Sequence, residues 1–352
     1  MKISEAELAV CENACSFLQS SMWGEFKSRF GWSAKAFLTE WLCDNSNEKT
    51  PLLVLCRKLL LGFSFAYIPW GPQLPVNFLQ NEREKAALEI AKKLKSYLPR
   101  NCVFIRFEPP WQINNEQAGN NKEMNDLFLS AGFKKAAATV QPPDTVIIDL
   151  SVKREQILSQ MKSKWRYNVS LAEKKGVHVK TCGAEEIDTF YNLLRETALR
   201  DGIAVHGITY YRTLFELNGE NLRLYMASHE GEVLAAIVVL FRGKEATYLY
   251  GASSNNKRNL MAPYALQWKA MQDAKDRGCL YYDLFGIPPD EDPNHPMAGL
   301  YRFKTGFGGQ IIHRPGSWDY AYKGLIYSLF NIAEKFRKKI FNLKKRKHKN
   351  QP

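Results

Sequence analysis

The sequence predicts an α/β protein whose mixed sheets form two tandem domains of the same fold. Three observations lead to this prediction. Strand-like and helix-like runs alternate along the chain, two stretches repeat one order of features, and 352 residues are enough for about two domains. Hydrophobic residues make up 45% of the chain, so each domain can bury a core.

Apolar runs rich in β-branched or aromatic residues predict the strands, and apolar residues at three- to four-residue spacing predict the helices. The expected strands are 52–56, 64–68, 103–107, 146–150, 222–227, 234–241, 247–251 and 281–284. The expected helices are 82–98, 155–175, 184–199 and 263–277. Several strands follow one another as hairpins, which favours mixed sheets over purely parallel ones.

An internal repeat supports the duplication. Two stretches read as apolar strand, basic turn and aromatic strand: "LLVLCRKLLLGFSFAYIPWGP" (52–72) and "LAAIVVLFRGKEATYLYGASS" (234–254). Each is followed by a helix and then by a cysteine-led strand that ends on two prolines, "CVFIRFEPP" (102–110) and "CLYYDLFGIPP" (279–289). The same order in both halves indicates two copies of one unit, with the boundary near "PPDTVIIDLS" (142–151).

Composition excludes several classes of protein. The N-terminus has early acidic residues and no apolar signal core, and the apolar stretch 52–70 is interrupted by Arg57 and Lys58. We therefore expect a cytoplasmic protein without a membrane span. The seven cysteines are odd in number and lack a CxxC pair, which argues against a disulfide framework and a zinc site. No metal site and no cofactor are expected.

Most of the net charge of +13 lies at the C-terminus. Residues 335–352 carry nine Lys or Arg and no acid, so the remainder carries 13 − 9 = +4. The run continues an apolar pattern that begins near Leu325, as in an amphipathic helix. Anionic lipid at the inner face of the plasma membrane and nucleic acid would each be attracted to it, and a solvated chain end is the plain alternative.

A hairpin, a strand, a loop and a helix, with a ligand where neighbouring strands separate, are typical of the GNAT acyltransferase fold. An acyl-CoA enzyme places a glycine-rich turn at the N-terminus of that helix, where backbone N–H groups bind pyrophosphate. The second half reads "SSNNKRNLMAP" (253–263) at this position and has no glycine. Acyl-CoA is therefore disfavoured, although Lys257 and Arg258 offer positive charge to another anion.

Six blocks in register resemble the Fem family (FemABX) of tRNA-dependent aminoacyltransferases that build peptidoglycan cross-bridges. The opening block, "LQSSMWGEFKSRFGW" (18–32), matches the family pattern Q-S-x-x-W-x-x-x-K. The other five blocks are "AYIPWGP" (66–72), "PPDTVIIDLS" (142–151), "MKSKWRYNVSLAEKKGV" (161–177), "YLYGASS" (248–254) and "LYRFKTGFGG" (300–309). Together they cover nearly the whole chain.

This resemblance implies two GNAT-like domains and a transfer reaction. Residues 1–145, completed by 316–340, are expected to form domain 1 and to bind the muropeptide carrier. Residues 146–315 are expected to form domain 2, and 341–352 a basic tail. The long coiled-coil arm of some members is not expected. The implied partners are aminoacyl-tRNA and a peptidoglycan precursor, either lipid II or UDP-MurNAc-pentapeptide, and we expect a monomer.

The family pattern also implies residues that bind the carrier. Lys27, with Trp23 four residues before it, matches the family lysine that contacts the diphosphate. Tyr67 and Tyr250 end strands where the ligand cleft of this fold opens, and we prefer Tyr250 to Tyr248 as the cleft residue because it precedes Gly251. An exposed helix lysine and packed tyrosines are the structural alternatives.

The family arginine and tyrosine that accompany this lysine fall within "RDGIAVHGITYY" (200–211). By spacing, His206 takes the arginine position and Tyr210 follows four residues later. Arg200 and Arg212 are nearby substitutes. This departure leaves the arginine contact open, and an ordinary loop histidine is the alternative.

Phe303 and Lys304 match the family Phe-Lys pair beside the acceptor amine. An aminoacyl ester is already activated, so catalysis requires alignment of the amine and stabilisation of an oxyanion, or binding of the tRNA terminal phosphate, by a cation. Gly306, Gly308 and Gly309 would let the backbone approach closely. Without the resemblance, the stretch 300–320 is typical of a packed hairpin.

Glu108, at the end of the third strand, replaces the acid expected near that family position and is our candidate for binding the attacking amine or relaying its proton. A structural strand-end carboxylate is the alternative. Lys162, Lys164 and Arg166 share the polar side of a predicted helix and, with Lys257 and Arg258, are the expected tRNA phosphate contacts. A solvated helix face is equally compatible with these residues.

Two other functions remain open on the sequence alone. One is an N-acyltransferase that uses acyl-CoA, which the missing glycine turn disfavours. The other is a non-enzymatic RNA- or membrane-binding protein that uses the basic segments.

Overall fold

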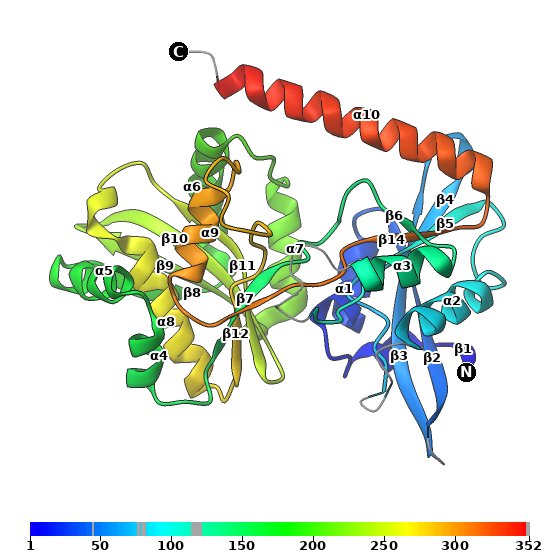
Figure 1. Cartoon of the computed structure of the whole chain (residues 1–352). Coiled ribbons are helices and arrows are strands. Elements are labelled where there is room, and N and C mark those ends of the chain that lie inside the picture. Colours follow the sequence, from blue (N-terminus) through cyan, green and yellow to red (C-terminus); the bar gives the residue numbers. More distant parts are fainter. Residues whose placement is uncertain (44–45, 76–77, 79–81, 114–121, 350–352) are drawn as a thin grey trace. The chain divides into compact units, whose positions relative to one another are not determined.

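The computed structural model describes residues 1–43, 46–75, 78, 82–113 and 122–349 (Figure 1). The chain forms two compact units. Unit 1 comprises Met1–Pro143 together with His313–Pro352, and unit 2 comprises Asp144–Ile312.

Unit 1 is built on a seven-stranded mixed sheet in the order β1-β2-β3-β4-β5-β14-β6. Only the β4–β5 pair is parallel among the neighbouring strands of this sheet. Its strands are β1 (Lys2–Ala6), β2 (Trp32–Cys43), β3 (Ser46–Lys58), β4 (Ser64–Ile68), β5 (Cys102–Phe107), β6 (Lys134–Lys135) and β14 (Trp318–Ala321). Its helices are η1 (Leu8–Cys11), η2 (Phe17–Gln19), α1 (Ser21–Ser28), η3 (Leu60–Gly62), α2 (Arg83–Leu94), α3 (Lys122–Ser130) and α10 (Gly324–Lys349).

Helices cover both faces of this sheet around β5. All six residues of β5 are buried, which is the pattern of a strand with packed elements on each side. Ile105 and Phe107 join a core formed with α2 and α3, whereas Phe104 contacts a second cluster that includes Tyr327 of α10. The C-terminal helix is therefore part of the folded unit.

Unit 2 has a second seven-stranded mixed sheet, in the order β13-β7-β12-β11-β10-β9-β8. Its strands are β7 (Thr145–Asp149), β8 (His178–Cys182), β9 (Leu222–His229), β10 (Glu232–Arg242), β11 (Glu245–Ser253), β12 (Tyr281–Asp283) and β13 (Gln310–Ile312). Its helices are α4 (Arg154–Gln160), α5 (Ser163–Lys174), η6 (Ala184–Glu186), α6 (Ile187–Asp201), α7 (Ile208–Asn218), η7 (Gly219–Asn221), η8 (Arg258–Leu260), α8 (Ala262–Asp276) and α9 (Ala298–Thr305). The β11–β12 pair is parallel, and α8 connects these two strands.

The predicted internal repeat is confirmed. In each unit an antiparallel hairpin, β3–β4 or β10–β11, leads through a crossover helix, α2 or α8, into a parallel strand, β5 or β12. A further helix, α3 or α9, then leads to a short strand, β6 or β13. Both sheets therefore follow one topology.

Each sheet is completed by a strand from outside this repeated run. β14 follows unit 2 in the sequence but lies between β5 and β6 of unit 1. Conversely, β7 follows β6 in the sequence but lies between β12 and β13 of unit 2. Unit 1 consequently needs the C-terminal part of the chain to fill the place between β5 and the edge strand β6.

Two local expectations are wrong. The predicted helix 155–175 is divided into α4 and α5, because Met161 has an extended backbone and the Lys162 N–H donates to the Gly306 carbonyl at 2.9 Å. The alternative of a packed hairpin for 300–320 is also wrong, because Ala298–Thr305 forms α9. At the C-terminus, α10 continues to Lys349 without a break at the expected tail boundary.

None of the helices in the described part of the chain is long and apolar enough to cross a membrane.

Candidate functional site

The parallel strands of unit 2 separate beyond a short paired segment. β11 and β12 pair only from Glu245↔Tyr281 to Thr247↔Asp283, although β11 continues to Ser253. A β-bulge at Leu249 lies in the separated part, because Val238 faces Tyr250 while the next residue of β10 faces Tyr248. Bulges of this kind redirect side chains next to functional sites. Beyond Thr247 the backbone of β11 is therefore no longer paired with β12. The fold binds its ligands where neighbouring parallel strands separate in this way.

Lys304 is buried beside this separation. It lies near the end of α9 with 6% of its surface exposed, and its Nζ donates to the carbonyls of Phe285 and Gly286, each at 2.9 Å. The same Nζ lies 5.1 Å from the centre of the Tyr248 ring. Burial lowers the pKa of Lys304 to about 7, although the nearby Asp283 carboxylate acts in the opposite direction. Both protonation states of the amine are therefore accessible near neutral pH.

The turn that receives Lys304 is held by Asp283. The Asp283 carboxylate is fully buried, accepts a hydrogen bond from the Phe285 N–H at 2.7 Å and accepts another from the Thr145 hydroxyl. Phe285 has a left-handed backbone with φ of 54°, which is unusual for a bulky residue. Its carbonyl is thereby placed against Lys304. Asp283 and Thr145 were not predicted as site residues.

Phe303, the residue before Lys304, packs against other aromatic side chains of unit 2. Its ring makes edge contacts with Tyr264 at 5.3 Å and with Phe307 at 5.1 Å, and its carbonyl accepts a hydrogen bond from Trp165 Nε1 at 2.9 Å. A Cβ at Gly306 would lie 2.1 Å from the Trp165 ring. The backbone at Gly306 therefore approaches another group closely, as expected, but that group is the Trp165 ring of the protein itself. This contact packs the C-terminal end of α9.

A second aromatic group of unit 2 contains three of the predicted substrate-binding residues. His206 is exposed and stacks on the Tyr210 ring, with centres 3.8 Å apart and an interplanar angle of 11°. The Tyr210 and Tyr250 hydroxyls are hydrogen-bonded, and burial raises the pKa of both. Tyr211 packs edge-on against Tyr250 at 5.2 Å. The structure brings His206, Tyr210 and Tyr250 together, and their binding role stays a prediction.

The two arginines considered as substitutes for the family arginine have other partners. Arg200 donates to the Ser253 carbonyl at 2.8 Å and thereby holds the end of β11. Arg212 forms an exposed ion pair with Asp188 at 2.8 Å. Both guanidinium groups thus have partners outside the group formed by His206, Tyr210 and Tyr250.

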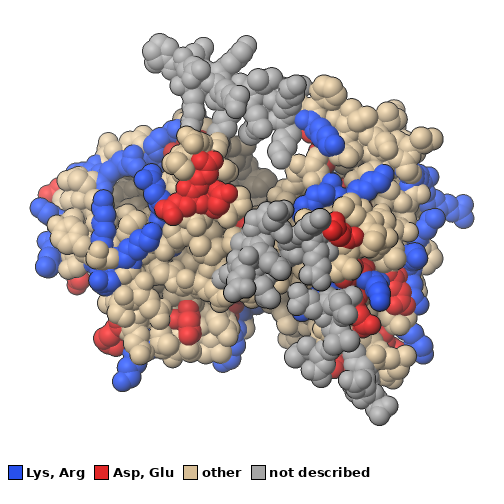
Figure 2. Space-filling model, in the orientation of Figure 1, with Lys and Arg blue, Asp and Glu red and all other residues tan. Residues whose placement is uncertain are grey.

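The predicted tRNA contacts on α5 are exposed. Lys162 is the N-cap residue of α5, and Lys164 and Arg166 lie in its first turn. Arg166 also donates to the carbonyls of Met161 and Ser159, so its guanidinium partly caps the end of α4. Figure 2 shows Lys and Arg side chains gathered over the part of unit 2 that contains α5 in Figure 1.

The two basic residues before α8 differ from each other. Lys257 forms ion pairs with Glu230 at 3.1 Å and Glu232 at 3.3 Å, so much of its charge is already compensated. Arg258 is exposed. Lys257 is therefore a weaker candidate for binding a phosphate than sequence position alone indicates.

In unit 1, the predicted lysine lies between two indole rings. Lys27 Nζ is 5.4 Å from the centre of the Trp23 ring and 5.5 Å from that of Trp32. Burial, followed by the positive charge of Arg57, lowers the pKa of Lys27 to about 8. The Trp32 ring in turn contacts Tyr67 at 5.8 Å. Lys27, Trp23 and Tyr67 thus belong to one aromatic and basic cluster.

Glu108 is a buried junction of unit 1. Its carboxylate accepts hydrogen bonds from the backbone N–H of Val140 at 2.6 Å, the N–H of Gln141 at 3.1 Å and the Ser317 hydroxyl at 2.6 Å. The Tyr67 hydroxyl donates to it as well. Burial raises the pKa of Glu108, and these four donors oppose that shift. The contacts are those of a structural carboxylate that joins β5 to the segments before β7 and β14, and a catalytic role stays a prediction.

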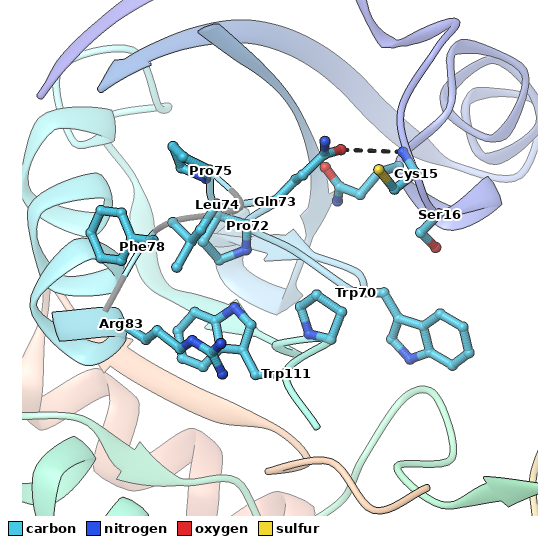
Figure 3. A pocket seen from close by; sticks show the side chains of 12 residues that line it. Cys15, Ser16, Trp70, Pro72, Gln73, Leu74, Pro75, Phe78, Arg83 and Trp111 are labelled. Carbon is cyan, nitrogen blue, oxygen red and sulfur yellow. Dashed lines mark hydrogen bonds between the residues drawn. The ribbon is translucent and has the colours of Figure 1, made fainter. Parts of the chain in front are cut away.

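A cavity of about 280 Å³ lies in unit 1 at the ends of β4 and β5 (Figure 3). Arg83, at the start of α2, lies 5.9 Å from the Trp111 ring, and Gln73 accepts a hydrogen bond from the Cys15 N–H. Trp111 Nε1 is buried and has no hydrogen-bond partner among the described residues. The described lining of the cavity consists largely of aromatic and proline side chains, with Arg83 as its cation. Such a lining suits a ligand that combines an apolar group or a sugar ring with one negative charge. The lining residues are Cys15, Ser16, Gln19, Trp70, Pro72, Gln73, Leu74, Pro75, Phe78, Arg83, Pro110 and Trp111.

None of these lining residues was predicted as a site residue. The available signal was the position of Trp70 and Trp111, each a few residues after a strand that takes part in the parallel pair. Within the described residues, no group of three or more His, Cys, Asp or Glu side chains is arranged to hold a metal ion.

The titration of Lys304 gives a stability prediction. The unfolded chain binds a proton at this lysine up to its ordinary pKa of 10.5, whereas the folded chain loses it near 7. The free energy of unfolding of the wild type should therefore rise with pH through this window, by about 2 kcal/mol between pH 7 and pH 9. Lys304→Met lacks this contribution. Urea unfolding of both proteins at the two pH values measures the difference, and a difference that does not change with pH would contradict the prediction.

Comparison with known proteins gives a family match over most of the chain. A model of the FemAB family matches residues 9–232 and 228–335. The lipid II:glycine glycyltransferase of Staphylococcus epidermidis is 23% identical over 399 aligned residues, which cover 93% of this chain and 92% of that protein. The protein of the same name from Staphylococcus aureus is 24% identical over 384 residues, and the alignment covers 89% of each chain.

Solved structures match the fold. A crystal structure of FemX superposes with a TM-score of 0.78 at 20% identity, covering 94% of this chain and 100% of that one. A tandem GNAT protein from the clavulanic acid biosynthesis pathway superposes with a TM-score of 0.52 at 11% identity, covering 91% of this chain and 98% of that one. The predicted fold of two tandem GNAT-like domains is confirmed.

Proposed function

Because the chain belongs to the FemAB family, we propose that it transfers an amino acid from aminoacyl-tRNA to the stem-peptide amine of a peptidoglycan precursor during cross-bridge synthesis. Relatives named lipid II:glycine glycyltransferase align with about nine-tenths of the chain and support this proposal. The structural observation that carries it is the buried Lys304 beside the separated strands β11 and β12.

The chemistry needs a positioned cation more than a nucleophile. The acceptor amine attacks the ester carbonyl and a C–N bond forms, the bond between the carbonyl carbon and the ester oxygen breaks, and the proton of the amine passes to that oxygen, which leaves as the ribose hydroxyl. Lys304 has three N–H donors, two of which hold the turn at Phe285 and Gly286. We propose that the third donates to the developing oxyanion or to a terminal phosphate of the donor. Its pKa of about 7 also lets it take part in the proton transfer.

Unit 1 is proposed to bind the acceptor carrier. Lys27 supplies positive charge between the Trp23 and Trp32 rings. Trp23 is buried, whereas the partly exposed Trp32 ring can contact a sugar or an apolar group. The cavity beside Arg83 and Trp111 supplies a second site for part of the same molecule. We favour a lipid-linked acceptor, as in the names of the relatives.

The donor is proposed to contact the exposed basic turn of α5. Lys162, Lys164 and Arg166 offer sequence-independent phosphate contacts, and such contacts weaken as salt concentration rises. Arg258 is the remaining exposed candidate of the predicted set.

Mass spectrometry tests the proposed reaction. The protein is incubated with a mixture of charged tRNAs and with either the lipid-linked precursor or UDP-MurNAc-pentapeptide. The proposal predicts that one acceptor gains the mass of an amino-acid residue, and that uncharged tRNA gives no gain. An unchanged mass in both acceptors, or a gain of an acyl group only when acyl-CoA is added, would rule the proposal out.

A further inference from the structure

One face of α10 exposes a continuous apolar stripe. Its residues are Leu325, Leu329, Ile332 and Phe336, whose surfaces are 87%, 68%, 53% and 61% exposed. Their spacing of four, three and four places them on a single side of the helix. A contiguous exposed apolar surface on a folded unit marks an interaction site more often than it marks chance.

The other side of α10 already attaches the helix to unit 1. Ile326, Tyr327 and Phe330 pack into the cluster around Phe104. Further along, Glu334 pairs with the buried Arg106 at 3.2 Å. The apolar stripe therefore adds nothing to the packing that holds the helix in place.

The charge of the helix identifies the partner. Beyond Phe336 the sequence continues the apolar spacing with Ile340 and Leu343. Nine Lys or Arg and no acid accompany them between residues 335 and 349. Apolar residues on one side with a strong excess of basic charge are the pattern of a helix that lies in the interface of an anionic membrane.

Other occupants fit less well. A second copy of the helix would bring two sets of like charges together, which opposes association. RNA would be attracted to the basic residues but gives no reason for four exposed aliphatic and aromatic side chains in a row.

We propose that α10 lies on an anionic lipid bilayer, with the stripe Leu325, Leu329, Ile332 and Phe336 inserted among the lipid headgroups and the basic charge of the segment 335–349 attracting the helix to the anionic surface. This surface lies on unit 1 and does not depend on the reaction in unit 2. Membrane binding can therefore fail while transfer to a water-soluble acceptor succeeds, and the reverse can also occur.

Vesicle flotation with the full chain tests the proposal. The vesicles contain phosphatidylcholine alone or phosphatidylcholine mixed with phosphatidylglycerol, at low and at high salt. The test variant replaces the four stripe residues with Gln, which keeps a side chain that is favourable in helices. The matched control replaces Leu42 and Leu199 with Gln, because these leucines are 85% and 83% exposed but lie outside α10.

The proposal predicts that the wild type and the control float with phosphatidylglycerol vesicles, more strongly at low salt. The stripe variant should lose about tenfold or more in vesicle affinity. Circular dichroism and transfer to UDP-MurNAc-pentapeptide should be unchanged if the fold is intact. The proposal is overturned if the wild type floats with neither vesicle or if the stripe variant floats like the wild type. It is equally overturned if the variant changes only self-association, measured by light scattering, or only tRNA binding.

Discussion

Replacing Lys304 with Met is expected to lower kcat for aminoacyl transfer by about a hundredfold or more. The reason is the position of Nζ, which is buried beside Tyr248 and is held by two carbonyls at 2.9 Å. Met retains the length and most of the volume of the side chain, so the packing of α9 is kept while the donor and the charge are lost. KM for the acceptor should change much less than kcat, because the carrier is proposed to bind in unit 1.

Lys244→Met is the matched control for this experiment. Lys244 is an exposed lysine of unit 2 that lies just before β11, and the control should retain the activity of the wild type. Steady-state kinetics with both substrates varied, together with circular dichroism of both variants, makes the measurement. A Lys304→Met enzyme that retains activity within about threefold of the wild type would remove the lysine from the mechanism.

The second large effect is expected on stability, at Asp319 of β14. Its carboxylate pairs with the buried Arg106 guanidinium through contacts of 2.7 and 2.9 Å and accepts a hydrogen bond from the Tyr327 hydroxyl at 3.1 Å. Asp319→Ala leaves that guanidinium with Glu334 as its remaining acidic partner. Removing one partner of a buried ion pair costs about 3–5 kcal/mol, and we expect a loss near the lower value because Glu334 remains.

Urea unfolding measures this loss, and hydrogen exchange of peptides from β5 assigns it to unit 1. The control is Asp276→Ala, which removes an exposed ion pair with Arg154 and should cost about 1 kcal/mol or less. The double variant Arg106→Met/Asp319→Leu should recover much of the lost stability, since the one partner that it leaves unpaired, Glu334, is partly exposed to solvent. Equal effects of Asp319→Ala and Asp276→Ala would contradict the structural role assigned to β14.

Much of the fold follows from local sequence pattern. The strands around Leu52–Ile68 and Leu234–Ser253 carry long apolar runs, and their hairpins and crossover helices are confirmed as predicted. The repeat made these predictions stronger, because each half supported the other. The break between α4 and α5 was missed because it depends on a distant partner, the carbonyl of Gly306, which no local pattern reveals.

The residue types of the candidate site could largely be predicted from the sequence, but the burial and the contacts of these residues could not. Lys304 was found through the family pattern, whereas its burial and its low pKa arise from the turn at Phe285 and from the packing of α9. Glu108 was expected to act on the amine, yet four hydrogen-bond donors from distant segments converge on it. Contacts of this kind between remote parts of the chain become visible only in three dimensions.

The exposed stripe of α10 shows the same limit. The sequence predicts an amphipathic helix with apolar residues near Leu325, but it does not separate those that pack from those that face solvent. The structure assigns Tyr327 and Phe330 to the core cluster and leaves Leu329 exposed. This separation defines the stripe that we propose as a membrane-binding surface.

A single-turnover measurement tests the proposed function most directly. A labelled amino acid is supplied to the enzyme and the lipid-linked precursor either as its tRNA ester or as its coenzyme A thioester. We predict that label enters the stem peptide from the tRNA ester alone, and that ribonuclease treatment of the donor abolishes the transfer. Transfer from the thioester at a comparable rate, or none from the tRNA ester, would contradict a tRNA-dependent aminoacyltransferase.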